Sequence, residues 1–226
     1  MNVLRVFIGY DSREVTAYHV LCDSIMRHTS TPVSITPLIQ QTLRNSNLYT
    51  RDIDGFASTE FSLTRFLVPA LSNYEGYSLF LDCDMLVQTD LTRLFQIAYD
   101  RPLHACHVVK HDYTPSTRVK MDHQVQLHYP RKNWSSVMLF NNDRCRILSP
   151  RFVNSVAPKT LHRFEWMEDP LIGDLSREWN WLVGEYAPNP DAHLLHYTLG
   201  GPWFQGCEFG VEGARWLEAK EKALGC

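Results

Sequence analysis

The sequence predicts an α/β protein with a mixed, mostly parallel sheet flanked by helices. The chain opens with a strand, a helix and a second strand, which is the unit from which parallel sheets are built. A later apolar strand, residues 77–81, runs directly into two aspartates. Ligands of open α/β sheets collect at such carboxyl ends, so the same feature also predicts where a site lies.

The opening elements follow from residue spacing and turn residues. Residues 3–9 are β-branched and aromatic and close on a glycine, which predicts a short buried strand. Asp11 and Glu14 form a capping arrangement, and apolar side chains recur at helical spacing over residues 12–28. Residues 33–36 lie between two prolines and are expected to form the second strand.

The next segments are less uniform. Residues 40–60 are polar and carry no clear period. Residues 61–71 have a helical pattern that their proline ends or kinks. After the apolar strand over 77–81, Asp90 is expected to cap a short helix.

The second half alternates strands with irregular stretches. The expected elements are a strand over 103–109, a long surface loop over 110–132, a strand over 135–140, a weak helix over 143–165, a strand over 194–197 and a charged helix over 214–224.

Composition and charge exclude several classes of protein. The chain has 226 residues, 44% of them hydrophobic, and no linker-like stretch, so we expect one domain with a core of its own. A formal net charge of −3 argues against nucleic-acid binding, which needs a basic face. The six cysteines form no C-x-x-C pair, which favours a reducing compartment. No apolar run approaches the ~18 residues of a membrane span, and no signal-peptide pattern is present, so a cytoplasmic protein is expected.

The strongest candidate site is the pair of carboxylates after the strand 77–81. Asp82 and Asp84 are two residues apart, so continued strand geometry places both side chains on one side. Two neighbouring anions repel each other unless a cation joins them. A hard divalent cation satisfies both carboxylates and commonly bridges to phosphate. The alternative is that the aspartates only cap the loop after the strand.

Two further segments suit a nucleotide or another anion. Tyr10 fits stacking on a base, Asp11 accepting a base N–H, and Arg13 pairing with a phosphate. An ordinary capped turn is the alternative there, and neither a G-x-G-x-x-G nor a Walker lysine pattern is present. Towards the C-terminus, His196 is a possible third metal ligand before two glycines whose N–H groups can approach an anion closely.

A second histidine-rich segment has the composition of a zinc site. It contains His104, Cys106, His107 and His111. A strand over 103–109 turns His107 away from His104 and Cys106, so structural roles are favoured.

Weaker signals remain open between a binding and a structural role. Arg65 suits a phosphate contact or a surface ion pair. Glu168 and Asp169 precede a proline and suit a catalytic acid pair or a solvated helix start. Trp179 and Trp181 suit a sugar face, although a buried core is the commoner role of tryptophan.

Seven segments, taken together and in order, resemble the GT-A glycosyltransferases of family 8, the group of glycogenin and the lipooligosaccharide galactosyltransferases. These segments are FIGYDSRE, FSLTRFLVPAL, GYSLFLDCDMLV, NWSSVMLFNN, EDPLIGDL, WNW and HYTLGGPW. They span nearly the whole chain and are most similar to short single-domain viral and bacterial members. The resemblance implies a Rossmann-like GT-A domain over 1–226. It also implies a nucleotide-binding half, residues 1–100, and an acceptor half, residues 101–226.

The resemblance further implies a UDP-sugar donor, a glycan or glycoconjugate acceptor, and Mn²⁺ or Mg²⁺. By position, the metal ion would be held by Asp82, Asp84 and His196. The nucleotide-sugar contacts would come from Gly9, Tyr10, Asp11, Arg13, Arg65, Asp82, Cys83, Asn133, Ser135, Ser136, Gly200 and Gly201. Asp169, with Glu168 beside it, matches the acidic position near the reacting carbon.

The chain departs from the family pattern at two places. Pro170 stands where the family often has a glutamine, and Gly201 stands where it usually has a lysine. The pyrophosphate would then be held by backbone N–H groups, Arg13 or Arg65.

The sequence therefore predicts a metal-dependent transferase that moves a hexose from a UDP-sugar to a hydroxyl of an acceptor. One alternative is a haloacid-dehalogenase-like phosphatase with Asp82 as the nucleophile. The late position of the aspartates in the chain and the missing following threonine disfavour it. Another alternative is a protein that binds nucleotide sugars or glycans without turning them over.

Overall fold

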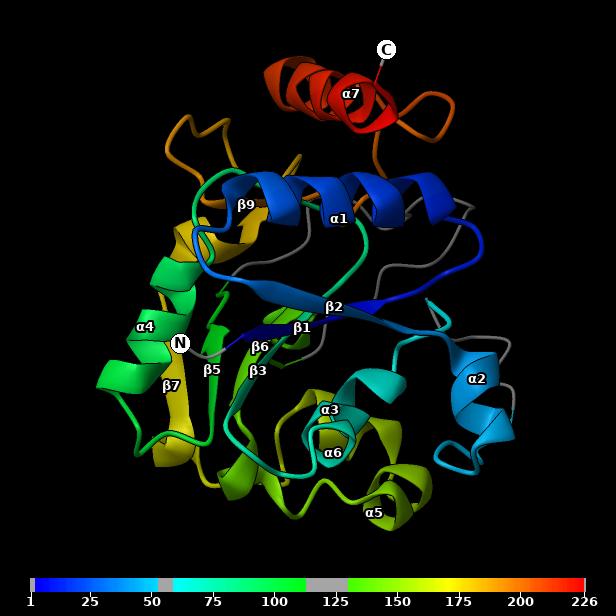
Figure 1. Cartoon of the computed structure of the whole chain (residues 1–226), viewed down its shortest axis with the longest axis vertical. Helices are drawn as coiled ribbons and strands as arrows, with labels where there is room; N and C mark the ends of the chain where they lie inside the picture. The colour runs from blue at the N-terminus through cyan, green and yellow to red at the C-terminus, as the bar shows by residue number, and fades with distance from the viewer. Residues whose placement is uncertain (1–2, 53–58, 113–129, 226) are drawn as a thin grey trace.

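A six-stranded sheet runs through the middle of the molecule (Figure 1). The computed structural model describes residues 3–52, 59–112 and 130–225. The strands of this sheet are β1 (Leu4–Gly9), β2 (Val33–Leu38), β3 (Tyr77–Leu81), β5 (Cys106–Val109), β6 (Val137–Asn141) and β7 (Ile172–Leu175).

The order of the strands is β2-β1-β3-β6-β5-β7. β1 pairs in parallel with β2 and β3, and β5 pairs in parallel with β7, whereas β6 runs antiparallel to β3 and β5. The predicted mixed, mostly parallel sheet is therefore confirmed.

A second, smaller sheet begins where the first one ends. It has the order β4-β9-β8, with β4 (Met85–Val87), β9 (Leu194–His196) and β8 (Trp181–Leu182). β4 follows β3 after three residues that contain both aspartates, and it pairs antiparallel with β9. The chain thus passes from one sheet to the other at the candidate site.

Helices cover both faces of the central sheet. The α-helices are α1 (Val15–His28), α2 (Gln40–Asn45), α3 (Val68–Leu71), α4 (Thr92–Asp100), α5 (Pro150–Ser155), α6 (Pro158–His162) and α7 (Gly210–Leu224). In Figure 1, α7 lies over α1 on one side of the sheet, while α3, α5 and α6 lie on the other side. Short 3₁₀ helices include η1 (Thr64–Leu67), η3 (Trp134–Ser136), η5 (Asp169–Leu171) and η6 (Arg177–Asn180).

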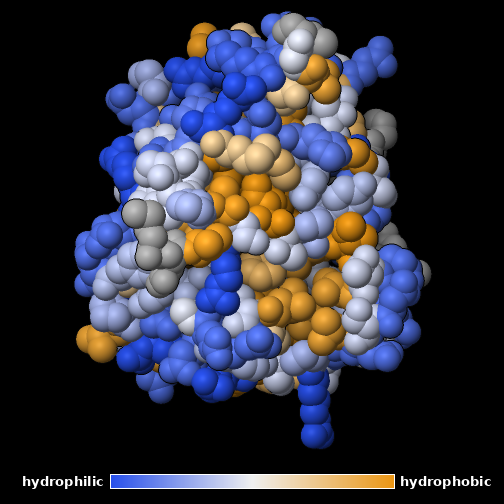
Figure 2. Space-filling view, viewed as in Figure 1, coloured by the Kyte–Doolittle hydropathy of each residue, from blue (hydrophilic) through white to orange (hydrophobic). Residues whose placement is uncertain are grey.

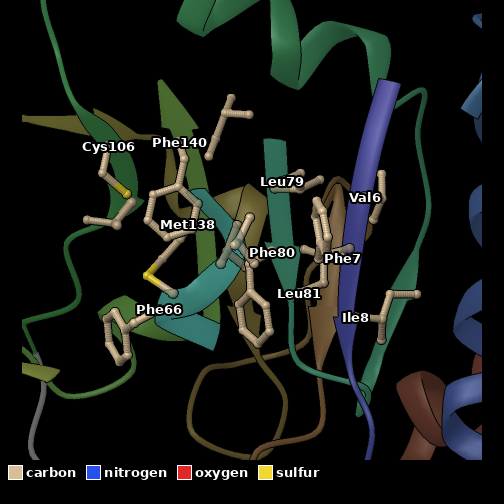
Figure 3. Close-up of a cluster of buried hydrophobic side chains, with 14 of the residues drawn as sticks. Val6, Phe7, Ile8, Phe66, Leu79, Phe80, Leu81, Cys106, Met138 and Phe140 are labelled. Carbon is tan, nitrogen blue, oxygen red and sulfur yellow. The ribbon is translucent and has the colours of Figure 1, made fainter. Parts of the chain in front are cut away.

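The main core is built from apolar side chains of the central strands. Figure 3 shows side chains of β1 and β3 in the core, among them Val6, Ile8, Leu79, Phe80 and Leu81, and all five are fully buried. Burial of each such side chain contributes about 1.5–3 kcal/mol relative to exposure. The strand ends that carry the candidate site are therefore rigidly anchored.

Several predicted boundaries in the first half were wrong. α1 begins at Val15 rather than at residue 12, because a turn precedes it in which Asp11 O accepts from the Glu14 N–H at 3.0 Å. Glu14, rather than Asp11, directly precedes α1 and makes no side-chain cap bond, while the Asp11 carboxylate accepts from the Arg13 N–H at 3.0 Å. β2 continues past residue 36 through Pro37, which an edge strand tolerates because one side of it needs no donor.

The remaining differences lie in segments with weak periodicity. The helix expected over 61–71 is η1 followed by α3, with its proline in the first turn of α3. The weak helix over 143–165 is divided into three short helical pieces, and the C-terminal helix begins at Gly210. The strands expected over 103–109, 135–140 and 194–197 form with shifted ends. Most of the loop predicted over 110–132 lies outside the described residues.

The face that carries α1 and β2 is largely hydrophilic, with apolar residues gathered near its middle (Figure 2). None of the helices in the described part of the chain combines the length and the apolar composition that crossing a membrane requires.

Candidate metal and nucleotide site

Asp82, Asp84 and His196 come together at the junction of the two sheets. One oxygen of each aspartate and one nitrogen of the histidine all lie within 4.8 Å of one another. In the described part of the chain, this is the only group of three or more His, Cys, Asp or Glu side chains that could hold a metal ion. The four residues of the histidine-rich segment 104–111 do not form such a group.

The pairing of β4 with β9 explains how His196 reaches the aspartates. Met85 is opposite His196 in this antiparallel ladder, and the Tyr197 N–H donates to the Asp84 carbonyl at 2.9 Å. The His196 Nε2 then lies 3.4 Å from the Asp84 Oδ1. Residues more than a hundred positions apart in sequence are joined by main-chain hydrogen bonds.

The two aspartates share one side for a reason that differs from the predicted one. The strand β3 ends at Leu81, so regular strand geometry does not continue through Asp82 and Asp84. Cys83 between them is fully buried, and its thiol donates to Glu14 Oε2 at 3.2 Å. Anchoring of Cys83 in the interior leaves the flanking carboxylates directed towards the site.

The three side chains fit a divalent cation of the Mn²⁺ or Mg²⁺ type. Two carboxylates supply hard oxygen ligands, and one imidazole supplies a nitrogen ligand that Mn²⁺ accepts. His196 Nδ1 is hydrogen-bonded to Asn180 Oδ1 at 2.9 Å, so its Nε2 is the nitrogen that faces Asp84. The donor set and its geometry therefore suit the metal ion that the sequence predicts.

Arg65 is buried beside this group. Its Nη1 donates to Asp82 Oδ1 at 2.7 Å and to the Ser135 carbonyl at 2.8 Å. The guanidinium lies between the rings of Phe61 and Phe80, with its Cζ 5.1 and 4.9 Å from their centroids. The alternative prediction for Arg65, a surface ion pair, is therefore wrong, because the ion pair between Arg65 and Asp82 is largely buried.

The predicted 133–136 segment also lies beside the aspartates. The Asp82 N–H donates to the Ser136 carbonyl at 3.1 Å, which holds this turn against the end of β3. Asn133 has a left-handed backbone with φ of 61°. The Ser135 hydroxyl hydrogen-bonds to His162 Nδ1 at 3.0 Å. Burial, and to a smaller extent the positive charge of Arg65, lowers the pKa of His162 to about 3.

The loop after β1 is more internally bonded than the sequence suggests. Asp11 is fully buried and accepts from the Arg13 N–H, the Arg13 guanidinium and the Glu60 N–H. Burial acts to raise the pKa of Asp11, but the bonds and charge of Arg13 lower it overall. Tyr10 packs edge-to-face on Tyr18 at 5.4 Å.

Packing explains why two of the predicted site positions, Gly9 and Gly201, are glycines. A Cβ on Gly9 would lie 2.2 Å from the Phe61 ring, and one on Gly201 would lie 2.0 Å from the Trp203 ring. Gly200 has φ of +101°, a conformation that favours glycine. The Gly200–Gly201 turn follows directly from the Tyr197 bond to Asp84 and so adjoins the metal group.

The predicted acidic pair, Glu168 and Asp169, is exposed at the surface. Asp169 is at the start of η5, 73% of its side chain is exposed, and it pairs with Arg131 at 2.6 Å. Glu168 is exposed next to it. Arg131 in turn lies over the Trp134 ring, which connects the acidic pair to the 133–136 turn.

Three residues at the site have roles that sequence reasoning did not assign. Glu14 is buried beside Cys83, the residue between the aspartates. Burial, and to a smaller extent the negative charge of Asp84, raises the pKa of Glu14 to about 8. His111 is buried, and its Nδ1 lies 2.8 Å from the Tyr186 hydroxyl. Burial, and to a smaller extent electrostatic repulsion from His196, lowers the pKa of His111 to about 3. The third is Asn180, whose position between the two tryptophans was the available signal.

Comparisons with known proteins agree with this architecture. The chain is 45% identical over 228 residues to Protein CDI of Arabidopsis thaliana, a match that covers 96% of this chain and 86% of that protein. No protein-family model matches the chain.

Several solved structures with the same fold are glycosyltransferases. GlyE of Streptococcus pneumoniae TIGR4 matches with a TM-score of 0.61 at 18% identity, over 97% of this chain and 60% of that one, so the chain spans about three fifths of its length. The bifunctional glycosyltransferase WbbM matches with a TM-score of 0.62 at 15% identity, over 96% and 49%. The galactosyltransferase LgtC, bound to donor and acceptor sugar analogues, matches with a TM-score of 0.58 at 11% identity, over 97% and 96%.

These neighbours establish the fold, and the phosphatase alternative is not favoured by them. The close plant relative establishes the kinship: this chain has the GT-A glycosyltransferase fold and belongs to the family of Arabidopsis thaliana Protein CDI.

Proposed function

We propose that the protein is a metal-dependent glycosyltransferase that moves a hexose from a UDP-sugar to a hydroxyl of a glycan or glycoconjugate. The observation that carries the proposal is the convergence of Asp82, Asp84 and His196 at the carboxyl end of β3 in a GT-A fold. Within it, residues 1–100 form the nucleotide-binding half, and residues 101–226 form the acceptor half.

Asp82, Asp84 and His196 would hold Mn²⁺ or Mg²⁺. When bound, such an ion supplies positive charge that offsets the negative charge developing on a departing diphosphate. Preorganised charge stabilisation of this kind lowers a barrier by several kcal/mol.

Other side chains of the chain would orient the donor. Arg65 carries a buried positive charge next to Asp82, and Arg13, paired with Asp11 at 2.7 Å, brings a second positive charge to the loop after β1. Tyr10 offers an aromatic face beside that loop. The backbone N–H of Gly201 offers a further donor to a phosphate, while the Gly200 N–H donates to the Tyr197 carbonyl at 2.8 Å and would have to exchange that bond to do the same. The 133–136 turn would lie against the sugar.

Asp169, or Glu168 beside it, would stabilise positive charge at the anomeric carbon or accept the proton of the acceptor hydroxyl. In the structure Asp169 is paired with Arg131. A carboxylate in this role would therefore exchange its bond to Arg131 for contact with the substrate.

The direct test is release of UDP. The chain is incubated with UDP-glucose or UDP-galactose, with and without MnCl₂, and free UDP is quantified. We expect Mn²⁺-dependent release that the D82N variant abolishes. Binding of the nucleotide sugar without any release favours a non-catalytic binding protein. Release of phosphate from an aryl phosphate, blocked by D82N, revives the phosphatase.

A further inference from the structure

Asn180 lies at the end of η6, fully buried, and makes hydrogen bonds in two directions. Its Oδ1 is 2.9 Å from His196 Nδ1. Its Nδ2 donates to the Ser136 hydroxyl oxygen at 2.8 Å and to the Asn133 carbonyl at 3.3 Å. One amide therefore connects the candidate metal ligand to the 133–136 turn.

The donors and acceptors around Asn180 determine the direction of each of these hydrogen bonds. The Ser136 hydroxyl donates its hydrogen to the Asn133 carbonyl at 2.7 Å, so its oxygen accepts from the Asn180 amide nitrogen. The amide oxygen of Asn180 must then face His196. Because an amide oxygen only accepts, His196 Nδ1 must carry the hydrogen.

The directions of these hydrogen bonds determine the tautomer of His196. With the hydrogen on Nδ1, the neutral imidazole has its lone pair on Nε2, the nitrogen that faces Asp84. A reversed amide would present N–H to Nδ1 and move the imidazole hydrogen to Nε2, which then has no lone pair for a metal ion. The Asn133 carbonyl, which only accepts and lies 3.3 Å from Asn180 Nδ2, opposes that reversal.

We infer that Asn180 is a positioning residue that sets the tautomer and the orientation of His196 for cation binding, with its own orientation fixed by Ser136 and the Asn133 carbonyl. The cation-binding part of this inference rests on the proposed function, whereas the tautomer part concerns the protein without metal. Partners of metal-binding histidines typically change metal affinity about 10- to 100-fold when they are removed.

The chain offers a matched control. Asn142 is also a fully buried asparagine, and its Nδ2 also donates to a backbone carbonyl and a serine hydroxyl, those of Glu75 and Ser78, each at 2.9 Å. It lies at the start of the 3₁₀ helix η4 (Asn142–Cys145), at the opposite end of β6 from Ser136. N142A and N142D therefore reproduce the loss of buried hydrogen bonds away from the aspartates.

The first readout is Mn²⁺ affinity, measured with MnCl₂ alone by the electron paramagnetic resonance of free Mn²⁺. We expect N180A to weaken binding about 10- to 100-fold and N142A to leave it unchanged. N180D keeps an acceptor opposite His196 Nδ1, because the Ser136 hydroxyl can rotate to donate to it, so affinity is expected to persist. N180A binding as tightly as N142A, or N180D binding as weakly as N180A, would overturn the inference.

The second readout needs no metal. Long-range ¹H–¹⁵N spectra of the metal-free protein, assigned by comparison with H196Q, report which imidazole nitrogen of His196 carries the hydrogen. We expect the hydrogen on Nδ1 in the parent and in N180D, and a mixture in N180A. A hydrogen on Nε2 in the parent contradicts the inference. If the parent has the expected tautomer yet binds no Mn²⁺ and releases no UDP, the proposed function fails and the tautomer inference stands.

Discussion

Asp84 contacts the β9 segment through both its side chain and its main chain. Its carboxylate lies 3.4 Å from His196, and its carbonyl accepts from Tyr197. D84N keeps the shape of the side chain and removes its charge. Loss of one ligand charge from a cation site is expected to reduce Mn²⁺-dependent UDP release at least about 100-fold, equivalent to roughly 3 kcal/mol of barrier.

The control for this prediction is D143N, which changes an exposed aspartate paired with Arg146 at 2.5 Å. It should release UDP at the parent rate. Equal activity of D84N and the parent, measured at a subsaturating Mn²⁺ concentration, would remove Asp84 from the ligand set.

Asp169 is the residue on which the assignment of a catalytic carboxylate depends. Its side chain is exposed and paired with Arg131, just as Asp143 is exposed and paired with Arg146. If Asp169 acts on the reacting carbon or the acceptor hydroxyl, D169N is expected to lower the turnover rate about 100-fold or more. D143N again serves as the matched change, and transfer at the parent rate by D169N leads to abandonment of the role.

Glu14 couples stability to pH. Burial and the Asp84 charge raise its pKa from 4.5 to about 8, so the folded protein holds a proton there that the unfolded chain releases. The stabilising contribution of this proton is full below pH 4.5 and is lost as the pH rises through about 8.

The free energy of unfolding, measured with urea in metal-free buffer, is therefore expected to fall between pH 5 and 8 partly because of Glu14. E14Q should flatten this dependence and exceed the parent in stability at pH 8. E221Q, a change at an exposed position of α7, should leave the profile unaltered. An E14Q profile parallel to that of the parent contradicts the assignment.

At the scale of elements, α7 fixes the turn that contains Gly200 and Gly201. Trp216 on α7 is fully buried and its ring lies 4.9 Å from that of Trp203, next to Gly201. W216A is expected to lower the free energy of unfolding by about 3–5 kcal/mol, because a large cavity replaces the indole. L217A, at a neighbouring position that is 45% exposed, should change it far less. Similar urea midpoints for the two variants would show that α7 does not support this turn.

Elements with strong periodicity or clear strand composition were predictable from sequence, and those that depend on tertiary pairing were not. β1 and β3 are apolar and buried, and their existence followed from composition alone. β8 and β4 have two and three residues, and they exist because β9 lies between them. The sequence predicts that the strand ends before Pro37, because sequence does not reveal that β2 is an edge.

The same division holds for the site. Asp82 and Asp84 were found because local sequence places them after an apolar strand. The buried bond between Arg65 and Asp82 and the role of Asn180 depend on how η1 and η6 pack against β3 and β9, which no local pattern specifies. A buried glutamate with a raised pKa, such as Glu14, was likewise hidden because its sequence context is that of a helix cap.

At the scale of the whole molecule, a cation at the candidate site would connect the two sheets. Asp82 and Asp84 lie between β3 and β4, and His196 lies on β9. A ligand that binds only the folded state stabilises it by about 2.7 kcal/mol when its free concentration is a hundred times its dissociation constant. For a chain of this size that corresponds to a rise of roughly 5–10 °C in melting temperature.

Thermal unfolding of the full chain tests this connection. MnCl₂ is expected to raise the melting temperature of the parent in a concentration-dependent way, and addition of EDTA should reverse the rise. D84N removes a ligand from the link between the two sheets and H196Q removes one from β9, so neither should respond, whereas D143N should respond like the parent. A rise that persists in both D84N and H196Q would place the stabilising ion elsewhere. No rise in the parent at millimolar Mn²⁺, alone or with UDP, would mean that the junction of the two sheets binds no cation, and the proposed chemistry would lose its source of positive charge.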